Sequence, residues 1–242
     1  MDSYFKSCLI FVVCILSLSP YAQAEDEKEE VPWSGKAALG YLATSGNTEN
    51  SSLNSSLEVG YKTGDWQHGF KAFAINASEN NVTTAEAYEF GWKSERNLTE
   101  HDFLFGRINW REDKFSGYRT QLSESIGYGR RFIDTEVHTL NGEIGLGARQ
   151  SELSDSTEEE EFIVRGGLNY KWAFSESAEF SQDFAVESGD KNTYLESITA
   201  LKADLVGSLS LIASYTIKNN SDVPIATEKT DTYSTLSLEY TF

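Results

Sequence analysis

The sequence has few of the residues that form covalent, metal and redox sites. Cysteine occurs twice in 242 residues, at Cys8 and Cys14, and histidine occurs three times. Both cysteines fall within residues 1–24, where a charged start, a short apolar run and the ending Ala22-Gln23-Ala24 predict a secretory signal peptide. The apolar run is too short to favour the alternative, a single membrane-anchoring helix. Cleavage after Ala24 leaves a mature chain without a thiol, which excludes disulfides and cysteine metal sites.

Proline is equally scarce, and its positions are informative. Pro20, Pro32 and Pro224 are the three prolines of the chain. They fall in the expected signal peptide, in an acidic stretch over residues 25–32 and in an expected loop. Because proline cannot donate a hydrogen bond to a β-ladder, these positions leave the segments between them free to form strands. We expect the acidic stretch to be a disordered tether that leads into one domain over residues 33–242.

Basic charge and long hydrophobic runs are also lacking. The chain has 20 Lys and Arg against 38 Asp and Glu, which gives a formal net charge of -18. This balance argues against a nucleic-acid-binding protein, which needs a basic surface. The mean hydropathy of -0.42 excludes a bundle of transmembrane helices, each of which needs about 18 or more apolar residues. A membrane β-barrel stays possible, because its strands are apolar only at every second residue.

What the chain does have, from Trp33 onward, is alternation with a period of two. Between residues 162 and 174 every second position is apolar, aromatic or glycine, and the polar residues Arg165, Asn169 and Lys171 fall only on the positions between them. Segments of this kind run for about 10 to 13 residues, the length of a tilted strand that crosses a membrane. We expect twelve strands, over residues 34–43, 51–61, 66–76, 84–96, 102–112, 119–132, 139–150, 162–174, 178–187, 194–205, 208–218 and 232–242.

The connections and the aromatic residues favour a barrel. Five connections are expected to be short, and six to be longer and more polar, among them residues 77–83 and 151–161. Aromatic side chains gather near both ends of the strands, as they do at the two interfaces of a membrane. The sequence therefore predicts an all-β protein, a transmembrane antiparallel up-and-down β-barrel of about twelve strands, with short periplasmic turns and long extracellular loops. A soluble, secreted β-sandwich is the alternative fold.

The last expected strand carries the sharpest local pattern. Leu236, Leu238, Tyr240 and Phe242 alternate with polar residues up to an aromatic C-terminus. This strand resembles the signal that the bacterial outer-membrane assembly machinery recognises, with Leu238, Tyr240 and Phe242 as the signal residues. We therefore expect the chain in the outer membrane of a Gram-negative bacterium. Its expected partners are the assembly machinery, outer-membrane lipid and lipopolysaccharide.

Several short motifs resemble those of a known family. They are Ser45-Gly46-Asn47-Thr48, Arg107 with Trp110 and Arg111, Gly127-Tyr128-Gly129, Gly145-Leu146-Gly147 and residues 231–242. On these motifs the chain, over about residues 33–242, resembles the YdiY-like family of salt-induced outer membrane proteins, a family of unknown function. The resemblance implies an outer-membrane β-barrel linked to salt or osmotic response. It brings no catalytic residues with it.

Catalytic and metal chemistry find little support in the sequence. His68, His101 and His138 are expected at or beside short turns, and none of them stands in a nucleophile or metal-ligand pattern. We therefore predict no enzymatic activity, no metal site and no cofactor. The acidic run Glu158-Glu159-Glu160-Glu161 is expected in an extracellular loop over residues 152–161. There it either attracts cations or is a solvated loop.

Charged residues on the inward faces of the strands are the candidate functional residues. We expect one basic wall and one largely acidic wall that faces it, because opposed charges would orient polar solutes in a lumen. The acidic wall also includes Glu179 and Glu187. The candidate selectivity residues are Arg107, Arg111, Arg149, Arg165 and Lys171 on the basic wall, and Asp183, Glu196, Asp204 and Glu239 on the acidic wall.

Two functions stay open at this point. Barrels of eight strands are filled by their own side chains, whereas barrels of sixteen strands leave an open channel, and twelve strands lie between these cases. We expect a narrow, porin-like channel for small polar or ionic solutes. The alternative is that the charges pair across the lumen and plug a structural, non-conducting barrel of the envelope whose acidic loops attract cations.

Overall fold

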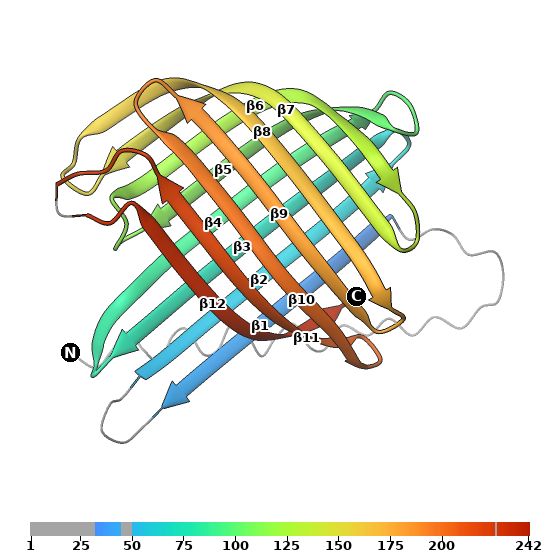
Figure 1. Ribbon diagram of the computed structural model, residues 1–242, viewed down its shortest axis with the longest axis horizontal. Coiled ribbons are helices and arrows are strands. Elements are labelled where there is room, and N and C mark those ends of the chain that lie inside the picture. The colour runs from blue at the N-terminus through green and yellow to red at the C-terminus, as the bar shows by residue number, and fades with distance from the viewer. Residues whose placement is uncertain (1–31, 45–49, 226) are drawn as a thin grey trace. The chain divides into compact units, whose positions relative to one another are not determined.

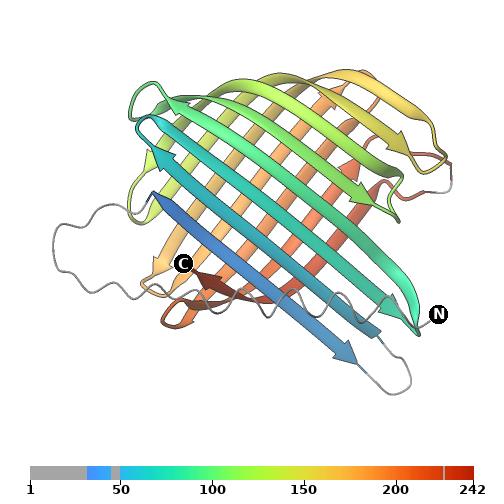
Figure 2. The ribbon, with the colours of Figure 1, turned by 180° about the vertical axis from the view of Figure 1, so that it is seen from behind.

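Twelve antiparallel strands form a closed barrel in the computed structural model, which describes residues 32–44, 50–225 and 227–242 (Figure 1). Each strand pairs with the next along the chain, and β12 pairs with β1, which is an up-and-down topology (Figure 2). The described residues include no helix long and apolar enough to cross a membrane. The strands are β1 (Trp33–Thr44), β2 (Asn50–Thr63), β3 (Trp66–Glu79), β4 (Val82–Asn97), β5 (Asp102–Asp113), β6 (Tyr118–Asp134), β7 (His138–Leu153), β8 (Glu158–Ser175), β9 (Ala178–Gly189), β10 (Thr193–Val206), β11 (Leu209–Asn220) and β12 (Thr230–Thr241).

The predicted fold, with its twelve strands in this order, is confirmed. The expected signal peptide, most of the tether and the first loop motif lie outside the described residues, so those expectations stay predictions. The strands are generally longer than expected and the loops correspondingly shorter. The expected loop over residues 77–83 is in fact a two-residue turn, Asn80-Asn81, with φ angles of 49° and 63°. Asparagine tolerates this left-handed conformation, and turns of this hand match the twist of paired strands.

The acidic run also differs from its prediction. Glu158 to Glu161 open β8, so the β7–β8 connection is only residues 154–157, and the expectation of a four-glutamate loop is wrong. The physical reason is a cross-strand partner. Glu161 stands opposite Arg149 in the β7–β8 register and bonds to its guanidinium, which draws the run into the ladder. The alternative function loses the loop that was expected to attract cations.

Aromatic side chains cover the outer surface at the short-turn end. The rings of Trp33 and Tyr61 lie 4.5 Å apart, and the ring of Trp66 stacks on His68 at 6.0 Å. On the other side of the barrel the His138 ring stacks at 6.0 Å from Trp172. Amphipathic rings favour the headgroup level of a membrane, and this is the girdle that the sequence predicts. Two of the three histidines thus belong to the outer surface, not to the lumen.

Inside the barrel, large rings fill the space that glycines leave. Phe103 and Phe105 of β5 are buried on the lumen side. Gly129 of β6 stands opposite Phe103, and a Cβ atom on Gly129 would overlap the Phe103 ring. Phe105 takes the same place over Gly127, its register partner. The glycine motif over residues 127–129 therefore makes room for these two rings in the part of the lumen near the short turns.

The seam between β1 and β12 is the shortest pairing of the barrel. Its register runs only from Lys36 opposite Thr241 to Leu39 opposite Leu238. At Gly40 the strands part, because β12 crosses the lumen side of β1 there. A Cβ atom on Gly40 would overlap the Leu236 carbonyl, and the Ser237 hydroxyl donates a hydrogen bond of 2.8 Å to Asn54 of β2. Figure 1 shows the long-loop ends of β1 and β12 far apart.

We predict that Gly129→Ala destabilises the barrel by about 1–3 kcal/mol, because the added methyl group overpacks the site beneath Phe103. Urea unfolding of the refolded protein in detergent micelles measures this change. Gly69→Ala is the matched control, since Gly69 also belongs to a strand and a Cβ atom there meets nothing within 4 Å. Equal stability of the two variants would contradict the packing role of Gly129.

We also predict where the seam can be cross-linked. In a background with Cys8 and Cys14 replaced by serine, the pair Leu39→Cys and Leu238→Cys forms a disulfide on mild oxidation, because these residues are register partners. The pair Leu42→Cys and Thr235→Cys, which would be opposite each other if the register continued, forms none. Gel mobility with and without reductant measures both. Efficient cross-linking of the second pair would mean that the seam is zipped to its end.

A polar lumen with a closed half and a hydrated half

All the charged residues predicted for the lumen lie on one set of register rows, which is the inward face. Arg111, for example, stands opposite Glu89 of β4 and Gln121 of β6, and Arg165 stands opposite Glu187 of β9. The inward orientation follows from the period of two, because these positions alternate with the exposed apolar side chains of the outer surface. The sequence therefore identifies which residues face the lumen, although not how they group there.

The arginines of β5, β7 and β8 converge on one carboxylate. Glu187 of β9 lies 3.4 Å from Arg111, 3.6 Å from Arg149 and 3.9 Å from Arg165. Arg149, whose side chain is 0% exposed, also bonds Glu161 at 2.6 Å and donates to the carbonyl oxygen of Asn192 at 2.5 Å. We call Arg111, Arg149, Arg165, Glu161 and Glu187 the arginine cluster. Buried charges of this kind persist only when they are paired and hydrogen-bonded. Each guanidinium group has at least one carboxylate partner, although the buried Nε atoms of Arg111 and Arg165 have no hydrogen bond.

Tyr194 extends the arginine cluster towards β10. Its ring is buried, and the Arg111 guanidinium lies over it at 3.7 Å from the ring centre. Ile163 is also fully buried. It lies on the inward face of β8, between Glu161, which stands opposite Arg149, and Arg165. Side chains from β5 to β10 thus fill this half of the lumen.

The expected pair of facing walls does not form. β8 and β9 are neighbours, so the basic side chains of β8 and the acidic side chains of β9 meet side by side rather than across an open lumen. Further inward charges of opposite sign interrupt each wall, such as Glu143 beside Arg165 at 3.3 Å and Lys202 beside Glu239 at 2.9 Å. These charges of opposite sign occupy inward positions with the same period of two. A list of both the acidic and the basic inward residues of every strand would therefore have predicted them.

Two contacts cross the lumen near its long-loop end. Lys218 of β11 forms an ion pair with Glu89 of β4, and Glu196 lies 3.8 Å from the same ammonium group. The Tyr233 hydroxyl of β12 donates a hydrogen bond of 2.6 Å to Asp113 of β5. Together they join the β11–β12 side to the β4–β5 side. The lumen is therefore constricted at this level.

The other half of the lumen is hydrated. Lys71 of β3 and Glu58 of β2 form an inward-facing ion pair of 3.0 Å, yet their side chains are 70% and 45% exposed. This exposure inside a closed barrel means that water reaches the wall formed by β2 and β3 at the level of this pair, whereas Asn54 and Ile75, nearer the long loops, are buried. The contrast with the fully buried Arg149 divides the lumen into a closed half and a hydrated half.

The remaining candidate residues surround the hydrated half and its lower end. Lys36 and Lys171 lie within electrostatic range of Glu58, and Asp183 and Arg107 lie within range of Lys71. Asp183 also accepts a hydrogen bond from Asn169. Nearer the short-turn end, Glu239 pairs with Lys202, and Asp204 accepts a hydrogen bond of 2.7 Å from Ser210. Arg107, Lys171 and Asp183 are thus the predicted residues that a solute in the lumen would meet.

Hydrogen bonds in the β5–β6 loop fix the structure of the barrel mouth at the long-loop end. The Asp113 carboxylate accepts hydrogen bonds from the backbone N–H groups of Phe115 and Ser116, at 3.0 and 3.2 Å. Lys114 in the same loop donates to Glu86, and this hydrogen bond raises the pKa of Lys114. Within the described part of the chain, no group of three or more His, Asp or Glu side chains is arranged to hold a metal ion.

Several known proteins are similar to this chain. A relative, the uncharacterized protein YdiY of Escherichia coli (strain K12), is 34% identical over 210 residues, which are 86% of this chain and 83% of the relative. An outer membrane channel from Pseudomonas putida F1 is similar with a TM-score of 0.51 and 10% identity, over 87% of this chain and 95% of that chain. The NanC porin has a TM-score of 0.49 and 10% identity, over 86% and 97%.

At such low identity the similarity to the channel concerns the fold alone, and the fold is that of an outer-membrane β-barrel. The sequence relationship is more specific. Residues 37–242 match the family described as protein of unknown function, DUF481. With this match and the identity to YdiY, the chain belongs to the DUF481 family, the YdiY-like family that its motifs predict.

Proposed function

We propose that this protein resides in the outer membrane of a Gram-negative bacterium and forms a narrow, off-centre channel for small polar or ionic solutes. The fold supports the address, because an up-and-down barrel with an apolar exterior is the form in which β-strands cross a membrane. Its partners are then lipid and lipopolysaccharide along the aromatic girdle, and the assembly machinery at the strand that ends in Leu238, Tyr240 and Phe242. The link to salt or osmotic response stays a prediction from the family resemblance.

The observation that carries the channel is the exposed ion pair of Lys71 and Glu58 inside the barrel. A barrel plugged by its own side chains would bury such a pair, as it buries Arg149. The hydrated half offers a passage along β1, β2 and β3, and the arginine cluster holds the opposite half closed. A solute that enters from the long-loop end passes the ion pair of Lys218 with Glu89 and the hydrogen bond of Tyr233 with Asp113, which both cross the lumen there. These two contacts are the constriction of the proposed channel.

The charge below the constriction determines which ions the channel prefers. The groups around the hydrated half are basic at Lys36, Lys71, Arg107 and Lys171, and acidic at Glu58, Glu89, Glu143 and Asp183. Charge in a narrow lumen sets the local concentration of ions, and because these charges balance, the preference depends on individual groups. We propose Arg107 and Lys171 as the basic selectivity residues, in place of the buried arginine cluster.

A non-conducting barrel is the second candidate, and the contacts that cross the lumen favour it. The ion pair of Lys218 with Glu89 and the hydrogen bond of Tyr233 with Asp113 narrow the lumen from opposite walls. A barrel of this kind would serve the envelope as a structural element. A measurement of conductance distinguishes this non-conducting barrel from the proposed channel.

We predict that the double variant Glu89→Gln and Lys218→Met conducts more than the wild type, because it removes the charges that hold two side chains together across the lumen. Single-channel recording of refolded protein in planar bilayers measures this. Glu228→Gln, an exposed change in the β11–β12 loop, is the control and leaves conductance unchanged. Absence of conductance in the wild type and in the double variant would sink the channel and leave the structural barrel.

We also predict that Lys71→Gln combined with Arg107→Gln shifts the ion preference towards cations, because it removes two basic groups and leaves the acidic groups around the passage in excess. The reversal potential in a salt gradient measures the preference. Lys191→Gln, in the exposed β9–β10 turn, is the control with a basic charge removed outside the lumen. A reversal potential that shifts as far in the control as in the lumen variant contradicts this selectivity.

A further inference from the structure

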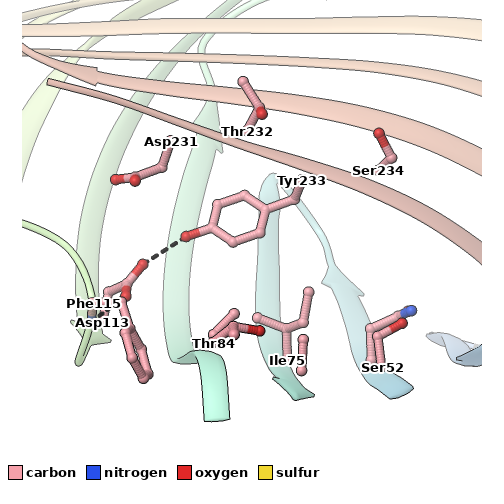
Figure 3. A pocket seen from close by; sticks show the side chains of 12 residues that line it. Ser52, Ile75, Thr84, Asp113, Phe115, Asp231, Thr232, Tyr233 and Ser234 are labelled. Atoms are coloured by element: carbon pink, nitrogen blue, oxygen red, sulfur yellow. Dashed lines mark hydrogen bonds between the residues drawn. The ribbon is translucent and has the colours of Figure 1, made fainter. Parts of the chain in front are cut away.

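A cavity of about 310 Å³ lies between the long-loop parts of β2, β3 and β4 on one side and β12 with the end of β5 on the other (Figure 3). It lies where β12 and β1 have separated, since their register ends at Leu39 opposite Leu238 and Ser237 bonds to Asn54 of β2. The hydrogen bond from Tyr233 to Asp113 forms one of its boundaries, as the dashed line in Figure 3 marks. The volume is at the lower end of the range for small-molecule sites, about 300–1,000 Å³.

The lining is rich in hydrogen-bonding groups of neutral or negative charge. The hydroxyl groups of Ser52 and Thr84 and the amide of Asn54 line one side of the space, and β12 lines the other at Thr232 and Ser234, whose own side chains point away from it (Figure 3). No lysine or arginine is among the lining residues of this cavity in the described chain. The cation beside Tyr233, Lys218, lies 5.5 Å from the centre of the Tyr233 ring and is already paired with Glu89 and Glu196. An anionic ligand would therefore meet Asp113 and Asp231 without a free cation, and is disfavoured. The rings of Tyr233 and Phe115 add flat apolar surface.

The unpaired strand edges restrict the occupant further. Among the described residues, β12 has no strand partner on its β1 side from Thr230 to Ser237, and β1 has none on its β12 side from Gly40 onward. Thr232 and Ser234 of this edge belong to the cavity lining. Unpaired backbone N–H and C=O groups cost several kcal/mol each in hydrocarbon. An acyl chain is therefore excluded from this space, and the occupant must itself be polar and rich in hydrogen bonds.

We propose that this cavity binds a neutral or amino-bearing polyhydroxylated group, the chemistry of a saccharide. Such a group offers many donors and acceptors to Ser52, Thr84, Asn54, the two carboxylates and the free edge of β12, and an apolar ring face to Tyr233 or Phe115. It reaches the site from solution through the long-loop mouth, or sideways between β1 and β12 as the headgroup of a glycolipid. The site goes beyond the proposed channel, because binding does not require conduction.

Titration calorimetry of the full barrel in detergent micelles tests the site with three probes: maltose, glucosamine and galacturonate. Maltose and glucosamine bind saturably, and galacturonate binds at least about tenfold more weakly. The double variant Ser52→Val and Thr84→Val weakens maltose binding by about tenfold, the loss expected for one or two hydrogen bonds. Ser181→Val, an inward-facing change on β9 near the short-turn end, leaves binding unchanged.

Vesicles distinguish the two sources of the ligand. If a glycolipid headgroup occupies the site, maltose affinity falls in vesicles that contain lipopolysaccharide and stays high in vesicles of phosphatidylcholine alone. Equal affinity in both means that the site takes a free saccharide. Either result supports the site.

Three results would overturn the proposal: no saturable binding of maltose or glucosamine, equal loss of binding in Ser181→Val, or binding of an extended peptide where no saccharide binds. The last would mean that a strand adds to the free edge of β12. The two proposals fail separately. Conductance without saccharide binding sinks this site and keeps the channel, and binding without conductance does the reverse.

Discussion

A backbone that crosses hydrocarbon must satisfy its own hydrogen bonds, and the other features of this barrel follow from how it does so. From β2 to β11 every strand has a neighbour on both sides, which fixes the alternation of faces along each strand. One face must be apolar because lipid surrounds it. The other face carries whatever polar residues remain, and with twelve strands those residues meet across a lumen of limited width. The lumen chemistry is thus a consequence of the ladder.

Charged side chains in so narrow a space must neutralise each other or stay in water. An unpaired buried charge costs several kcal/mol, so the arginine cluster is stable only as a set, with Glu161 and Glu187 among three guanidinium groups. This set joins β5, β7, β8 and β9 and excludes water from that half. Lys71 and Glu58 have no comparable group of buried charges around them and remain exposed to water. The asymmetry of the lumen therefore arises from where the inward arginines fall in the register.

The sequence predicts the strands, their order and their inward faces, because these depend on a period of two that is local in the chain. It does not predict contacts between distant strands. Lys218 and Glu89 are 129 residues apart and meet only because the barrel narrows there. Local composition also misleads in two places. The glutamates at 158–161 look like a solvated loop until Arg149 is placed opposite Glu161, and Asn80-Asn81 looks like part of a longer loop until its left-handed geometry is seen.

The seam between β1 and β12 is the place where the backbone does not satisfy all of its own hydrogen bonds. Side chains hold β12 in place there, with Ser237 bonded to β2 and Tyr233 bonded to β5, while the backbone edge of β12 from Thr230 to Ser237 has no strand partner on the β1 side among the residues that the structure describes. In water an unpaired backbone group costs little, because a hydrogen bond contributes only about 0.5–1.5 kcal/mol net. In hydrocarbon each free backbone group is far more costly. The open edge is therefore tolerable only where water or another polar group reaches it. The seam is paired from Lys36 to Leu39, and the open edge of β12 borders the polar cavity at Thr232 and Ser234.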